Sequence, residues 1–118
     1  TRKGLHITNR SSVIRYGLYA DDIDSTQSLT ADTWYNFVFT LNNTSYLKQI
    51  YMNGLLDVSG TGGGAYTGTG SNTRIGGKVL NFGKYFDGNM SIVTAYNRVL
   101  TALEVKQNYN AIKGRFGL

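Results

Sequence analysis

The side chains that could do chemistry in this chain are few, and their spacing excludes most kinds of catalysis. His6 is the only histidine and cysteine is absent, so any Ser/His/Asp or Cys/His arrangement would have to use His6. No signature nucleophile motif occurs anywhere in the sequence, and His6 falls in a short predicted strand. We therefore predict a structural role for His6.

The carboxylates give no better support for an enzyme. Hydrolysis of a glycosidic bond needs two carboxyl groups placed across that bond. The chain has seven acidic residues, and no predicted strand carries two of them at even spacing. Glu104 is expected to cap a helix. We predict that the chain is not an enzyme.

One acidic cluster could bind a cation. Asp21, Asp22 and Asp24 are close in sequence, and hard cations such as calcium prefer several oxygen ligands. The spacing does not match an EF-hand loop. A calcium site at these three residues and a solvated polar loop over residues 21–32 therefore stay as alternatives, with no other cofactor expected.

Aromatic residues are the more informative candidates. The chain has nine tyrosines and one tryptophan, and such side chains are frequent on binding surfaces, although most are expected to lie in the core. Tyr66 lies in a glycine-rich stretch, residues 60–70, which no regular element can bury. This stretch lacks the Gly-Lys-Ser/Thr ending of a phosphate-binding loop. The candidate ligand-binding residues are Tyr66, Trp34, Tyr19 and Asn36.

Composition limits the partners. The 118 residues suffice for one domain, and 41% of them are hydrophobic. The net charge is +5, but Lys and Arg are scattered singly, so a nucleic-acid partner is not expected. No apolar run approaches the roughly 20 residues needed to span a bilayer, so no membrane insertion is expected.

The elements that must position these residues are mostly strands. Strands are predicted over residues 5–8, 13–20, 34–41, 46–52, 55–59 and 73–76, with a loop or edge segment over 78–84 and a last long strand over 86–97. In the strongest of them, Tyr35, Phe37 and Phe39 share one face with Leu41. The dipeptide Asn53-Gly54 predicts a type I′ hairpin turn, which needs positive φ at both residues.

The chain ends in a predicted helix over residues 102–113. Thr101 and Glu104 form a capping box, and Leu100 and Val105 occupy the two positions of a hydrophobic staple. Val105, Tyr109 and Ile112 recur on one helical face, with Gly114 as the expected stop. The C-terminal residues Phe116 and Leu118 are expected to fold back onto the sandwich.

Three segments together resemble the laminin-G-like branch of the concanavalin A-like lectin/glucanase superfamily. They are WYNFVFT at residues 34–40, IYMNG at 50–54, and FDGNM at 86–90 running into AYNRVLT at 95–101. The resemblance implies an all-β antiparallel β-sandwich, a jelly roll, with one short C-terminal helix. It covers the later part of such a domain, so we expect residues 1–118 to form a domain that lacks its first strands. Ser91 and Ile92 stand where acidic residues are often found in that family.

The tail, from residue 96 onward, is also similar to the ends of phage structural proteins with this fold. The resemblances imply a non-enzymatic virion structural or adhesion module, of the capsid-decoration or tail-fibre type. Its expected partners are other virion proteins, copies of itself or cell-surface glycans, and its expected location is the virion or the extracellular space. The alternative is a carbohydrate-binding module of a secreted bacterial protein.

Overall fold

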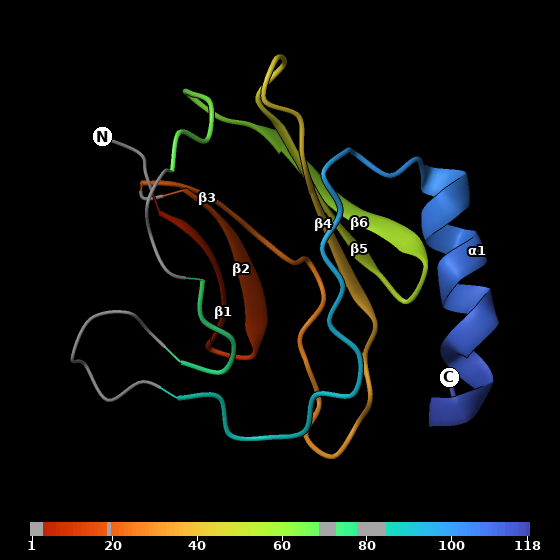
Figure 1. The fold of residues 1–118 in the computed structure, drawn as a ribbon. Coiled ribbons are helices and arrows are strands. Elements are labelled where there is room, and N and C mark those ends of the chain that lie inside the picture. Colours follow the sequence, from red (N-terminus) through yellow and green to blue (C-terminus); the bar gives the residue numbers. More distant parts are fainter. Residues whose placement is uncertain (1–3, 19, 69–72, 78–84) are drawn as a thin grey trace.

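The computed structural model describes residues 4–18, 20–68, 73–77 and 85–118, and they form two small antiparallel sheets and a helix (Figure 1). The first sheet has the order β1-β2-β3 and the second has the order β4-β5-β6. The strands are β1 (Leu5–Arg10), β2 (Val13–Leu18), β3 (Asp21–Asp24), β4 (Phe37–Leu41), β5 (Leu47–Met52) and β6 (Leu55–Thr61). The predicted antiparallel β-sandwich is confirmed. The loop or edge segment predicted over residues 78–84 lies outside the described residues.

Tight turns set the register of both sheets. Asn53 and Gly54 have φ values of 51° and 81°, so the predicted turn between β5 and β6 has positive φ at both central residues. The turn between β1 and β2 also has positive φ at both central residues, 53° at Ser11 and 66° at Ser12. The second turn was not predicted as a two-residue hairpin, because Ser-Ser carries no positive-φ signal of the Asn-Gly kind.

A row of contacting aromatic rings lies between the two sheets. Tyr35, Phe37 and Phe39 stack in sequence, with ring centroids 5.9 Å apart at each step. Tyr16, on β2 of the other sheet, contacts Phe39 with centroids 5.1 Å apart. Burial raises the pKa of Tyr16 to about 12, because the phenolate would lose its hydration. The predicted apolar face of this strand is therefore the one that packs against the first sheet.

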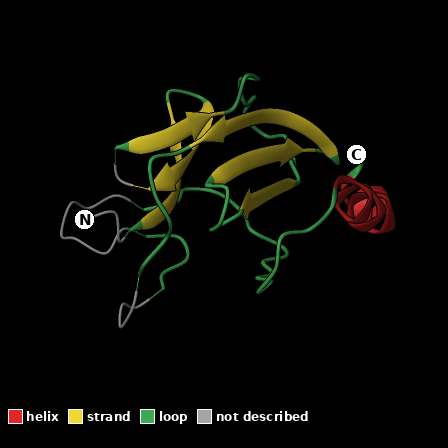
Figure 2. Ribbon diagram, turned by 90° about the horizontal axis from the view of Figure 1, so that it is seen from above, coloured by secondary structure: helices red, strands yellow, loops and turns green. Residues whose placement is uncertain are grey.

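The helix α1 (Ala102–Ile112) packs against the second sheet at the end that carries the β5–β6 turn (Figure 2). Its capping box is present, and the staple residues Leu100 and Val105 are buried in one cluster with Tyr51 of β5 and the partly buried Val38 of β4. Val38 explains why β4 has apolar side chains on both faces: one face meets the first sheet and the other meets α1. None of the helices in the described part of the chain is long and apolar enough to cross a membrane.

The α-helix ends at Ile112, within one residue of the predicted end, but the residue that terminates the helical chain differs from the expected one. A short 3-10 helix, η1 (Lys113–Phe116), continues from α1, and the left-handed residue that ends it is Gly117, with φ 68°. Gly114 lies inside η1, so its prediction as the stop was wrong by three residues. Phe116 folds back as expected, and its ring lies 5.0 Å from the ring of Trp34.

Two predicted elements differ in the structure. Residues 21–24 were expected to begin a loop, but they form β3, which pairs with β2 and whose carboxylates contact basic side chains of β1, β2 and β5. Residues 86–97 were expected to form a long strand, but they form no strand. Tyr85 makes one isolated bridge with Gly77, and 73–76 are not a strand either. An extended segment needs a paired neighbour, and the described strands offer none to residues 86–97.

Among the described residues, hydrogen bonds join the two sheets near one margin. At the β3–β6 margin, Asp57 of β6 accepts hydrogen bonds from the backbone N–H and the hydroxyl of Thr26, at 2.7 and 2.6 Å. There, Gly60 approaches Ile23 so closely that an added Cβ would lie 2.5 Å from Ile23 Cγ2. At the opposite margin, β1 and β4 are the outermost described strands of their sheets.

Candidate functional site

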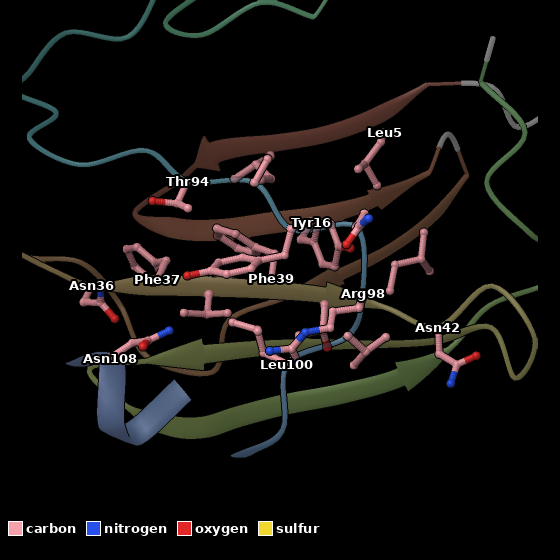
Figure 3. Close-up of a pocket in the computed structure, with 18 of the residues that line it drawn as sticks. Leu5, Tyr16, Asn36, Phe37, Phe39, Asn42, Thr94, Arg98, Leu100 and Asn108 are labelled. Carbon is pink, nitrogen blue, oxygen red and sulfur yellow. The ribbon is translucent and has the colours of Figure 1, made fainter. Parts of the chain in front are cut away.

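An open cavity of about 950 Å³ lies at the β1–β4 margin. Its walls come from the inner face of the first sheet, the whole of β4, residues 92–100 and the last two turns of α1. Figure 3 shows Tyr16, Phe37 and Phe39 pointing into the space between the sheets, with Asn36 and Asn42 near its two ends. A second open cavity of about 1100 Å³ adjoins it and is lined partly by residues 86–94. Both cavities therefore open at this margin.

Tyr66 lies at the rim of the first cavity, and its position is fixed. The side-chain amide of Asn43 accepts from the Tyr66 backbone N–H at 2.9 Å and donates to the Tyr66 carbonyl at 3.1 Å. The Tyr66 ring lies over Gly68, where an added Cβ would be 2.5 Å from Tyr66 Cζ. The residue is 37% exposed, as predicted for a tyrosine in the glycine-rich stretch. The loop is therefore anchored at the residue that carries the ring.

The predicted ligand-binding residues do not form one group. Trp34 lies before β4 and lines the second cavity, where it packs against Phe116. Tyr66 is held by Asn43, which follows the other end of β4, and the five residues of β4 span about 17 Å. Asn36 lines both cavities. Tyr19 lies outside the described residues.

The predicted calcium ligands each contact a different basic side chain. Asp21 pairs with Lys48, with Nζ and Oδ1 2.9 Å apart. Asp22 pairs with His6, with Nε2 and Oδ1 3.0 Å apart, and Asp24 accepts two hydrogen bonds from Arg15, both at 2.7 Å. Alternation along β3 also sends Asp21 to the face opposite Asp22 and Asp24. The structure thus does not gather these carboxylates, and no group of three potential metal ligands occurs among the described residues.

Two of these carboxylates do share a strand face, contrary to the expectation that no strand carries two at even spacing. Asp22 and Asp24 lie side by side on the outer face of β3, which the sequence had assigned to a loop. The hydrogen bonds from Arg15 lower the pKa of Asp24, so that carboxyl stays ionised in ordinary conditions. His6 reaches Asp22 across Gly17, the register partner of both residues. Both carboxylates are therefore in contact with a basic side chain.

The remaining acidic residues divide into two kinds. Asp57 ties the loop after β3 to β6, and Glu104 caps α1 and pairs with Arg98. Asp32 and Asp87 are exposed and line the second cavity together. They are the carboxylates among the described residues that line this cavity.

Sequence reasoning missed two residues that matter most to this arrangement. Lys48 is 1% exposed and points inward. Its burial could have been predicted from the sequence, because Lys48 is evenly spaced from Ile50 and Met52 on the buried face of β5. Asn43 had no local signal, because its partner Tyr66 is 23 residues away.

Comparisons with known proteins agree with this fold. A search of curated proteins found no match. Among solved structures, an S-layer domain-containing protein from Clostridium thermocellum is similar, with 19% sequence identity and a TM-score of 0.51. The match covers 92% of this chain and 57% of that chain, so this chain spans little more than half of its neighbour. At this identity the likeness concerns the fold. The model of the family described as the concanavalin A-like lectin/glucanases superfamily matches residues 5–106, and the chain therefore belongs to that superfamily.

Proposed function

We propose that this chain is a non-enzymatic recognition module that works outside the cell and binds glycan at the rim around Tyr66. The observation that carries the proposal is the double hydrogen bond between the Asn43 amide and the Tyr66 backbone. It holds an aromatic ring at a cavity rim before any ligand arrives, which removes an entropic cost of binding.

The composition of the rim supports this proposal. The segments that meet there are NNTS at residues 42–45 and GGGAYTG at residues 62–68. Tyrosine offers a large, rigid and amphipathic contact area, while Asn, Ser and Gly supply adaptable hydrogen bonds. Tyr96, Asn97 and Arg98 line the same cavity and add further polar groups. Sugars present both apolar C–H faces and hydroxyl groups, and this rim offers a partner for each.

Two settings fit such a module. The sequence favoured a virion protein of the capsid-decoration or tail-fibre type, with a module of a secreted bacterial protein as the alternative. The structural neighbour is named for a bacterial S-layer domain, which favours the second setting. Both settings place the module outside the cell and need the same rim.

A non-enzymatic role is part of the proposal. Five of the seven carboxylates are engaged in ion pairs, a cap or a loop tie, which leaves Asp32 and Asp87. A glycosidase needs one carboxyl group kept protonated and another ionised, on opposite sides of the scissile bond. Asp32 and Asp87 are both exposed to solvent, which does not favour such a division of roles.

The test is a binding assay with one variant and one matched control. The chain is applied to an array of bacterial cell-wall and exopolysaccharide oligosaccharides, and the best binder is titrated by calorimetry. Tyr66→Ala should weaken binding about tenfold, equivalent to about 1.4 kcal/mol. Tyr85→Ala is the control, because Tyr85 is 81% exposed and lines neither cavity. Absence of glycan binding, or equal binding by the two variants, would contradict the proposal.

A further inference from the structure

Gly62 is the first residue after β6, and its backbone lies directly against a buried ion pair. A Cβ added at Gly62 would overlap Asp21 Oδ2 and Lys48 Nζ and would lie 2.5 Å from Asp21 Cγ. The pair beneath it is closely packed, because Lys48 Nζ and Asp21 Oδ1 are 2.9 Å apart and the two side chains are 1% and 13% exposed. A larger residue at this position would therefore displace either the pair or the loop that begins at Gly62.

The turn between β4 and β5 holds Gly62 from another side. The Gly62 backbone N–H donates to the Tyr46 carbonyl at 3.0 Å, and Tyr46 ends this turn with a positive φ of 60°. Within the turn, Asn42 Oδ1 accepts hydrogen bonds from the backbone N–H groups of Thr44 and Ser45, at 2.9 and 3.0 Å. Gly62 is therefore fixed between an ordered turn and the buried ion pair.

The short segment that carries the Tyr66 ring, residues 62–66, has an anchor at each end. Gly62 is the first anchor, and the second is Tyr66 itself, whose backbone makes two hydrogen bonds with the Asn43 amide. The residues between them are Gly, Gly and Ala, and glycine has wider backbone freedom than any other residue. With the second anchor alone, the segment would keep that freedom, and the direction of the ring would vary with it. The position of the ring thus depends on both anchors.

A second glycine of the same chain segment makes a different kind of close approach. Gly60 also lies against the first sheet, where an added Cβ would be 2.5 Å from Ile23 Cγ2. Gly60 is inside β6 and is the register partner of Lys48, so its contact serves the packing of the two sheets. Gly62 follows Thr61, the last paired residue of β6, so its contact acts on the loop instead.

We propose that Gly62, seated on the Lys48–Asp21 pair, is a positioning residue for the rim around Tyr66. It touches no ligand, and it acts by fixing the start of the segment whose other end Asn43 holds. Through this contact, β3 of the first sheet is coupled to a rim that belongs to the second sheet. The effect on affinity rests on the proposed glycan binding, whereas the effect on the Tyr66 backbone does not.

The test uses two variants that crowd this contact from opposite sides. Gly62→Ala adds a Cβ to the loop, and Lys48→Arg puts a larger guanidinium beneath it while keeping the positive charge. In both, residue-resolved hydrogen exchange should show the Tyr66 amide exchanging about tenfold faster than in the wild type. Affinity for the oligosaccharide that bound best on the array should fall about tenfold. The matched control, Gly60→Ala, should lower the urea midpoint of unfolding and leave both quantities unchanged.

Three results would overturn the proposal. The first is a wild-type exchange rate for the Tyr66 amide in both variants, and the second is an equal acceleration in Gly60→Ala, which general loosening of the sandwich would explain. The third is faster exchange with unchanged glycan affinity, because the rim would then bind without a fixed loop. If the wild type binds no glycan, the proposed function fails, and the exchange rates still decide whether Gly62 positions Tyr66. If Gly62→Ala does not fold, Lys48→Arg decides.

Discussion

Removing one partner of the Lys48–Asp21 pair should destabilise the fold more than removing both. The pair joins β5 to β3 across the sandwich, with side chains that are 1% and 13% exposed. Lys48→Met leaves the Asp21 carboxylate without this cation inside the protein, which typically costs about 3–5 kcal/mol. Because Asp21 keeps some access to water, we expect the lower value, about 3 kcal/mol. Asp21→Leu together with Lys48→Met should return close to the wild-type stability, since an apolar pair needs no compensation.

The measurement is urea unfolding of the wild type, both single variants and the double variant. With an m-value of about 1.5 kcal/mol/M, a loss of 3 kcal/mol lowers the midpoint by about 2 M. The control cycle uses Arg15→Met and Asp24→Leu, an equally short pair on the outer face with side chains 28% and 40% exposed, which should show much weaker coupling. Coupling for Lys48–Asp21 as small as in the control would refute the assignment of a buried inter-sheet ion pair.

Three further outcomes are expected. Gly54→Val should cost at least about 2 kcal/mol in thermal melting, because φ is 81° and the side chain would meet Tyr109, whereas Gly114→Ala, with open space around it, should leave the melting temperature unchanged. Hydrogen bonds from Arg98 and from the Thr101 backbone lower the pKa of Glu104 from 4.5 to about 2. The stability that the ionised Glu104 adds to the fold is therefore complete above pH 4.5 and lost as the pH falls toward 2. Glu104→Gln should remove this part of the pH dependence of the melting temperature. Reducing-sugar assays on polysaccharides should detect no turnover, and turnover that Asp32→Asn or Asp87→Asn abolishes would show a hydrolase.

The features that could be predicted from the sequence are those determined by neighbouring residues. The Asn53-Gly54 turn and the Thr101 cap follow from side-chain and backbone chemistry within four residues. The aromatic face of β4 follows from period-two alternation. Each of these needs no knowledge of distant parts of the chain.

The features that could not be predicted depend on distant partners. Asp22 looked like part of a polar loop because His6, its partner, comes from another strand. Residues 86–97 alternate as a strand does, but a strand also needs a paired neighbour, which periodicity does not supply. The exposure of Tyr66 was predictable from its glycine-rich surroundings, whereas its anchoring by Asn43 was not.

The difference between the two margins of the sandwich has a consequence for its motion. Asp57 ties β6 to Thr26 just after β3, and the Lys48–Asp21 pair ties β5 to β3, so the sheets can separate most easily at the other side. The softest collective motion is then a hinge-like opening about the β3–β6 margin, of the microsecond-to-millisecond kind. In a protein exposed to flow at a surface, tension across the sheets would concentrate where β1 and β4 part. Whatever occupies that side determines how far the hinge can open and how much force the module withstands.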